Sequence, residues 1–192
     1  MIFISEIRIQ VASSATLILL YYHFRKRGVQ NMIVSTTRFG ELEIDSEKII
    51  TFPKGIPGFE NLHQFIIIPV EGTEDIHWLQ SVESPGIALM VIDPFKFVNG
   101  YACAIPEPDI AELELEAPGE ALILTTITIP RDNPAQTTTN LVAPIVINTR
   151  LNLAKQVIMS GSPYQTKHLL FQGINKKGPH RENQKASGGE GK

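Results

Sequence analysis

The sequence has few of the residues that build covalent or metal-bound frameworks. It contains one cysteine, Cys103, so no disulfide can form within the chain and an oxidising compartment is not required. Its five histidines are scattered, and none is spaced with another histidine or with the cysteine as the ligands of a metal site are. The sequence therefore predicts neither a metal ion nor any other cofactor.

The motifs that mark common enzyme classes are also missing. There is no glycine-rich phosphate loop, no Walker motif and no Gly-x-Ser-x-Gly turn. Glu112, Glu114 and Glu116 alternate along the chain, which favours a solvated face, since acid–base catalysis needs two carboxylates in different environments. Cys103 has no base beside it in the sequence and is interpreted as a small buried side chain. We expect no catalytic activity.

No apolar run in the sequence reaches the length of a membrane span. The run VASSATLILLYY covers residues 11–22, whereas a spanning helix needs about 20 residues. A basic cluster follows this run instead of preceding it, unlike a signal peptide. The segment is either a short membrane anchor or, as we favour, part of a leader over residues 1–31 that is not made in the cell. Met32 opens a segment typical of folded protein, and Arg27-Gly28 allows a purine-rich ribosome-binding site just upstream.

The net charge of −3 conceals an uneven distribution. Residues 32–172 contain 17 acidic and 8 basic residues, a balance of −9, while residues 1–31 and 173–192 each carry +3. An acidic surface repels the phosphates that nucleic-acid binding neutralises, and it attracts basic proteins. We therefore expect no direct binding of nucleic acid; the acidity serves either solubility or a basic partner. Residues 173–192 have hardly any apolar side chains and are predicted to be a disordered basic tail.

Short runs rich in β-branched residues dominate the rest of the chain. Proline, glycine, asparagine and aspartate separate these runs at the spacing of an all-β barrel or sandwich. One short helix is expected over 108–116, with Pro108 and Asp109 at its start. The sequence predicts an all-β, mainly antiparallel, single β-barrel-like domain over 32–172 with one or two short helices. The expected strands are 41–44, 48–52, 65–70, 76–82, 87–92, 100–105, 121–129, 140–149 and 154–159.

The loop FPKGIPGFEN, residues 52–61, is unusual because it is rich in aromatic residues as well as in proline and glycine. Pro57 and Gly58 fit the two central positions of a type II turn, and Gly55 permits a further sharp bend. The sequence therefore predicts a rigid projection that carries an aromatic ring at each end.

Two interpretations of this loop stay open. In the first, Phe52 and Phe59 seal the end of the barrel. In the second, Ile56, Pro57 and Phe59 present a preformed apolar contact, which loses little entropy when a partner binds. Glu60 either caps the turn or faces a basic partner.

The motif WLQSVE, residues 78–83, combines one large aromatic side chain with polar groups. Trp78, Gln80 and Glu83 are candidate partner contacts because tryptophan is favoured at interface hot spots, although burial in the core is its commoner fate.

The segment 140–150 contains a proline within an apolar run. A proline cannot donate to a strand ladder, so Pro144 predicts that the strand over 140–149 is an edge or carries a bulge. An edge strand is a natural docking site for another chain, which makes Asn140 and Pro144 candidate contacts. Arg150 either pairs with a carboxylate of a partner or forms an ordinary surface ion pair.

Three of these stretches together resemble one known family. FPKGIPGFE at 52–60, WLQSVESPGIALMVIDP at 78–94 and NLVAPIVINTR at 140–150 are similar in order and spacing to FliW, the bacterial flagellar assembly factor family. The resemblance extends over about 130 residues, from FGELEI to QVIM. Leu89 departs from it, because an aromatic residue is expected there.

The resemblance implies a cytoplasmic β-barrel-like protein without catalytic activity. FliW proteins bind newly made flagellin and also CsrA, the RNA-binding translational repressor of flagellin message, and thereby couple flagellin export to flagellin translation. The resemblance thus implies flagellin and CsrA as partners, with no direct nucleic acid and no membrane. Two other hypotheses stay open: a small-ligand-binding β-barrel or hydrolase of unknown substrate, and a membrane-tethered protein if residues 11–22 are translated.

Overall fold

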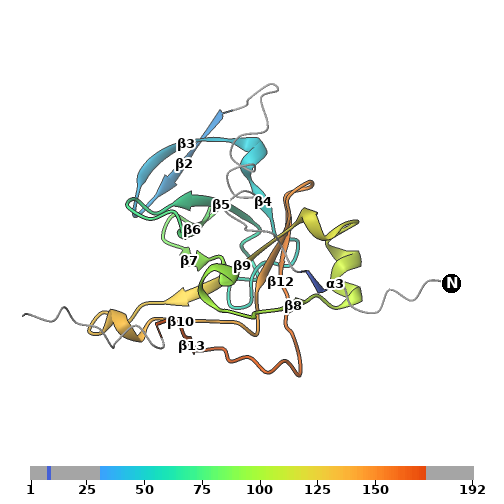
Figure 1. Ribbon diagram of the computed structural model, residues 1–192. Coiled ribbons are helices and arrows are strands. Elements are labelled where there is room, and N and C mark those ends of the chain that lie inside the picture. The colour runs from blue at the N-terminus through green and yellow to red at the C-terminus, as the bar shows by residue number, and fades with distance from the viewer. Residues whose placement is uncertain (1–7, 10–30, 172–192) are drawn as a thin grey trace, which may run out of the picture.

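The computed structural model describes residues 8–9 and 31–171, and a ring of β-strands lies at its centre (Figure 1). β11, β12, β4, β5, β6, β7 and β9 follow one another around the sheet, and β9 pairs back with β11 to close it. Their bounds are β4 Ile50–Thr51, β5 Gln64–Pro69, β6 Ile76–Ser81, β7 Ala88–Ile92, β9 Ala121–Thr128, β11 Ile145–Asn148 and β12 Leu153–Gln156.

The pairings in this ring are antiparallel except for one. β12 pairs with β4 in parallel through Leu153 and Thr51. β9 is the longest strand and joins three neighbours along its length: residues 121–124 pair with β11, 125–126 with β7, and 127–128 with β10. The all-β, mainly antiparallel, barrel-like prediction is therefore confirmed.

Short elements surround the ring. β2 and β3 form a separate hairpin, β8 pairs with β1, and β10 with β13 extends the sheet beyond β9. The helix α3 lies where a short helix was predicted, although it ends earlier than expected, and α2 was not predicted. The bounds are β1 Arg8–Ile9, β2 Asn31–Thr36, β3 Gly40–Asp45, α2 Pro94–Phe97, β8 Cys103–Ala104, α3 Glu107–Glu112, β10 Thr138–Thr139 and β13 His168–Leu169, with 3-10 helices at Ser46–Lys48, Pro118–Glu120 and Pro134–Gln136.

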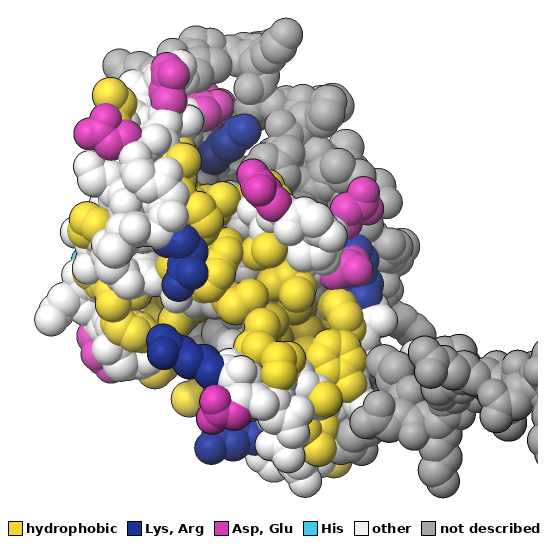
Figure 2. Space-filling view, turned by 90° about the vertical axis from the view of Figure 1, so that its left-hand side faces the viewer, with side chains coloured by type: hydrophobic (Ala, Val, Ile, Leu, Met, Phe, Trp, Pro, Cys, Tyr) yellow, Lys and Arg dark blue, Asp and Glu magenta, His cyan; other side chains and the backbone are white. Residues whose placement is uncertain are grey.

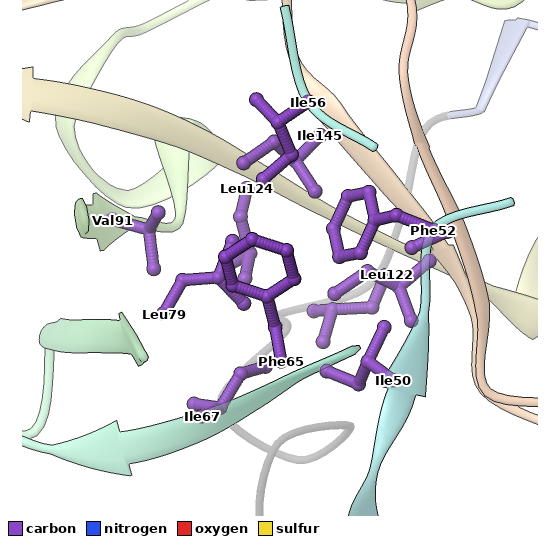
Figure 3. Packing of buried hydrophobic residues seen from close by; sticks show 12 residues of the cluster. Ile50, Phe52, Ile56, Phe65, Ile67, Leu79, Val91, Leu122, Leu124 and Ile145 are labelled. Carbon is purple, nitrogen blue, oxygen red and sulfur yellow. The ribbon is translucent and has the colours of Figure 1, made fainter. Parts of the chain in front are cut away.

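The interior of the ring is filled by aromatic and branched aliphatic side chains (Figure 3). The rings of Phe52 and Phe65 meet edge to face, with centroids 5.1 Å apart, and neither side chain is exposed. Leu122 and Leu124 point into the same cluster from β9, because alternate residues of a strand share a face. Each such side chain contributes about 1.5–3 kcal/mol when it leaves water.

A second buried cluster covers the outer face of the same strands. Ile123 of β9 and Val146 of β11 pack there against Tyr101, Cys103 and the residues that follow α3. Both faces of residues 121–124 of β9 and 145–147 of β11 are therefore buried, which explains why these stretches are continuous apolar runs instead of alternating ones.

Two strand predictions were wrong. The run 140–149 contains only β11, and β11 is flanked by β12 on one side and β9 on the other, so it is not an edge strand. Pro144 precedes β11, is buried, and accepts a hydrogen bond from the N–H of Val157 through its carbonyl oxygen. In addition, β2, β10 and β13 were not predicted as strands.

The predicted leader over residues 1–31 and the predicted tail over 173–192 lie outside the described residues, apart from β1 and Asn31. In the described part of the chain, no helix combines the length and the apolar character needed to cross a membrane.

Candidate protein-binding surface

The loop 52–61 closes one end of the ring and also contributes to the surface there. Phe52 is fully buried, and Ile56 is only 2% exposed, so these two side chains seal the interior. Pro57 is exposed and Phe59 is partly exposed. The two interpretations of the loop therefore apply to different residues, because the same loop fills the barrel and presents apolar side chains outside it.

The turn within this loop has the predicted geometry. The N–H of Phe59 donates to the carbonyl oxygen of Ile56 at 2.7 Å, and Gly58 has a φ of +88°. An exposed carboxylate caps the turn, since Oε1 of Glu60 accepts a hydrogen bond from the N–H of Gly58 at 2.8 Å. That backbone hydrogen bond lowers the pKa of Glu60 below its ordinary value.

A groove of about 460 Å³ lies beside this loop. Thr126 and Thr128 line it from the same face of β9 that carries Leu122 and Leu124 into the core, so the groove is the mouth of the barrel. None of the twelve described residues that line it is charged. They are Ile56, Pro57, Phe59, Leu89, Met90, Thr126, Ile127, Thr128, Asn140, Ala143, Gln156 and Ile158.

Several of these side chains leave apolar area in contact with solvent. Ile158 is 59% exposed, and Leu89 and Met90 are partly exposed. Figure 2 shows one face of the molecule on which apolar side chains form a continuous area, with basic and acidic side chains around it. Contiguous exposed apolar area with polar residues around it is typical of a protein-binding surface.

Four of the predicted contact residues meet at this groove. Ile56, Pro57 and Phe59 come from the loop, and Asn140 comes from a segment more than 80 positions later. Oδ1 of Asn140 accepts hydrogen bonds from the N–H groups of Val142 and Ala143, so this asparagine fixes the turn that leads into β11.

Trp78 lies outside the groove and fastens the β2–β3 hairpin to the barrel. The guanidinium carbon of Arg38 is 4.3 Å from the centroid of the Trp78 ring, and the ring of Phe39 packs edge-on at 6.1 Å. Both contacts come from the tip of the hairpin, so the tryptophan has a structural role there.

Gln80 and Glu83 both hold backbone segments in place. The side chain of Gln80 is fully buried, and its Nε2 donates to the carbonyl oxygens of Ser81 and Ile87 at 2.9 and 3.0 Å. This burial contradicts the expectation that the side chain of Gln80 contacts a partner. Glu83 is exposed, and its carboxylate accepts hydrogen bonds from the N–H groups of His63 and Gln64.

The remaining two predicted residues are also engaged within the chain. Arg150 forms ion pairs with Glu116 and Glu120 at 3.0 and 3.1 Å, as expected of an ordinary surface pair. Pro144 is buried and does not line the groove, which contradicts its prediction as a partner contact on an exposed edge.

The sequence analysis missed most residues of the groove wall. Leu89, Met90, Ile127, Gln156 and Ile158 were assigned to strands without a role. Strand periodicity could have predicted two further lining residues, Thr126 and Thr128, because they continue the alternation of Leu122 and Leu124 along β9. Which loop lies over that end of the barrel depends on the closed sheet and cannot be read from local sequence.

The described residues contain neither a cluster of metal-ligating side chains nor a reactive thiol. Within residues 8–9 and 31–171, no three His, Cys, Asp or Glu side chains converge as a metal site requires. Cys103 is fully buried, and burial raises the pKa of its thiol to about 12, so the thiol is a poor nucleophile. Among the described residues, the groove combines a concave shape with exposed apolar side chains and is therefore suited to bind another molecule.

Comparison with known proteins agrees with this architecture. The FliW protein family model matches residues 33–170. The chain belongs to the FliW family. Similar members include the flagellar assembly factor FliW of Moorella thermoacetica, 41% identical over 140 residues that cover 73% of this chain and 89% of that protein. The FliW of Thermosipho africanus is 44% identical over 134 residues, which cover 70% and 92% of the two chains.

A solved structure supports the FliW fold directly. The crystal structure of a flagellar assembly factor FliW superimposes with a TM-score of 0.68 at 34% sequence identity, and the match covers 73% of this chain and 97% of that one. The resemblance inferred from the three motifs is therefore confirmed.

Proposed function

We propose that this protein binds newly made flagellin and antagonises the translational repressor CsrA. Flagellin that accumulates in the cell occupies the protein, CsrA is released, and flagellin translation falls. When flagellin is exported, the protein becomes free to bind CsrA, and translation resumes. Membership of the FliW family is the basis of this proposal, because the family's curated members are flagellar assembly factors.

The observation that supports a protein partner most strongly is the uncharged groove at the mouth of the barrel. Pro57 and Phe59 are held in place by a hydrogen-bonded turn, so they lose little entropy when they are covered. Burial of the exposed part of Ile158 provides further apolar area. We assign flagellin to this groove.

The charge of the domain supports a basic second partner. Residues 32–172 have a balance of −9, which steers an RNA-binding protein such as CsrA toward the surface and disfavours direct contact with RNA. Steering of this kind weakens as ionic strength rises. We therefore expect CsrA binding to lose affinity with added salt and flagellin binding to change much less.

The proposal includes neither catalysis nor a membrane. We place the protein in the cytoplasm, where flagellin is translated. A second candidate function follows from the size of the groove, since about 460 Å³ lies in the range of small-ligand sites. A small-ligand-binding barrel or hydrolase would have to use the uncharged polar groups of this groove.

Calorimetric titration of the full chain with flagellin and, separately, with CsrA tests the proposal. Phe59→Ala removes an apolar contact from the groove, and we expect flagellin affinity to fall about tenfold or more. Phe171→Ala is the matched control, because Phe171 is 40% exposed and does not line the groove. Equal losses in the two variants would refute the assignment of flagellin to the groove. Binding to neither protein by the wild-type chain would refute the proposed function and favour a small ligand.

A further inference from the structure

Two side-chain amides hydrogen-bond to the backbone of one residue in the groove wall, Ala143. Oδ1 of Asn140 accepts a hydrogen bond from the N–H of Ala143 at 3.1 Å, and Nε2 of Gln156 donates to the carbonyl oxygen of Ala143 at 2.9 Å. Asn140 precedes β11 and Gln156 ends β12, so the two amides approach Ala143 from different segments. All three residues line the groove.

Each amide uses one of its two polar atoms in these internal hydrogen bonds, which leaves the other atom for a further hydrogen bond. Nδ2 of Asn140 is a free donor and Oε1 of Gln156 is a free acceptor, since neither atom has a hydrogen-bond partner among the residues that the structure describes. Neither atom is among the fully buried unpaired side-chain atoms of the described residues, and Asn140 and Gln156 are both partly exposed. The groove thus presents one oriented donor and one oriented acceptor next to an apolar surface.

We propose that Asn140 and Gln156 bind the backbone of a partner in an extended conformation. The backbone of an extended chain offers a carbonyl oxygen to Nδ2 of Asn140 and an N–H to Oε1 of Gln156. In the interior of a helix these backbone groups are already paired with each other, so a helical segment has none to offer. The absence of charge from the groove wall disfavours a segment with a charged side chain at its centre, because that charge would be left unpaired.

The occupant is therefore an extended segment with apolar side chains that flank the bound peptide group. We expect one of its apolar side chains to pack against Pro57 and Phe59 and another to pack against Ile158, since all three residues line the groove. This inference rests on the proposed function, because it describes how the flagellin chain would lie in the groove.

Two substitutions remove the free half of each amide and keep the internal bond. Asn140→Asp retains the oxygen that accepts from Ala143 and loses the Nδ2 donor. Gln156→Lys retains a donor for the carbonyl oxygen of Ala143 and loses the Oε1 acceptor. The two changes add opposite charges, so a purely electrostatic effect would move the affinity for flagellin in opposite directions. We expect both variants to bind flagellin at least about tenfold more weakly.

Matched controls carry the same substitutions outside the groove. Asn99→Asp and Gln136→Lys change exposed residues that do not line it, and we expect less than about a twofold effect on flagellin affinity. Unfolding curves of all four variants identify any change that acts through stability. Wild-type affinity in Asn140→Asp and Gln156→Lys, or changes of opposite sign, would overturn the inference.

Nuclear magnetic resonance supplies a readout that is independent of mutation. We expect the side-chain NH₂ signals of Asn140 to shift when flagellin binds and those of Asn99 to stay unchanged. A flagellin segment that is helical when bound in the groove would also overturn the inference. These outcomes are distinct from a failure of the proposed function, in which the wild-type chain does not bind flagellin at all.

Discussion

Two glycines in the loop 52–61 provide a matched pair for testing how the loop seals the barrel. Gly55 and Gly58 both have positive φ, +67° and +88° respectively. Alanine at either position therefore costs about 1–2 kcal/mol of folding free energy from backbone conformation alone.

The surroundings of the two glycines differ sharply. A Cβ added at Gly58 meets nothing within 4 Å, whereas one added at Gly55 lies 2.6 Å from the carbonyl oxygen of Phe59 and 2.7 Å from the Cα of Glu60. These are backbone atoms, so the loop itself must move, and Ile56 leaves its buried position. Loss of that burial adds about 1.5–3 kcal/mol. We therefore expect Gly55→Ala to lower the free energy of unfolding by about 3–5 kcal/mol and Gly58→Ala by about 1–2 kcal/mol.

Urea unfolding followed by fluorescence measures both values, because Trp78 is the only tryptophan and lies on β6. The slope of the unfolding free energy against urea concentration should be the same in both variants. An unchanged slope shows that both expose the same surface on unfolding, so their free energies can be compared directly. If Gly55→Ala costs no more than Gly58→Ala, the close approach of the loop backbone is not what holds Ile56 in the core.

Three further predictions concern the core, pH and an ion pair. Phe65→Ala removes a fully buried side chain, and urea unfolding should show a loss of about 3–5 kcal/mol; a loss below about 1 kcal/mol would contradict its place in the core. Burial, assisted by nearby Lys96, lowers the pKa of His77 below its ordinary 6.5, so the unfolded chain takes up the proton first. Stability should therefore be complete well above pH 6.5 and fall as the pH drops through 6.5 toward the lowered folded pKa, and His77→Gln should flatten this dependence below about pH 7.5. Lys155→Met breaks ion pairs of 2.5 and 2.7 Å to Asp109 and Glu112. Because all three groups are partly exposed, we expect urea unfolding to show a loss of no more than about 1 kcal/mol in unfolding free energy. This loss should be smaller in high salt, which screens the ion pairs.

Local sequence was sufficient to predict much of the fold. The turn at 56–59 formed as expected because proline and glycine leave the backbone few alternatives there. β5, β6, β7 and β9 lie within a residue or two of their predicted runs, since dense β-branched residues mark them.

Long-range pairing explains what local sequence could not predict. Pro144 was assigned to an edge because it cannot donate to a ladder, yet it only precedes β11, and that strand pairs on both sides once β9 closes the ring. Gln80 is polar and was therefore expected at the surface, but its side chain is buried. Its Nε2 donates hydrogen bonds to carbonyl oxygens of Ser81 and of the turn that follows. The groove itself joins the 56–59 loop to Asn140, Gln156 and Ile158, and only the closed sheet brings those segments together.

Hydrogen–deuterium exchange of the full chain, alone and with flagellin, tests the central claim most directly. We expect flagellin to slow amide exchange in the segments that line the mouth of the barrel, namely 56–59, 126–128, 140–143 and 156–158. Slower exchange confined to other segments, such as α3 or the β2–β3 hairpin, with no change at the mouth, would contradict the claim that this groove is the protein-binding surface.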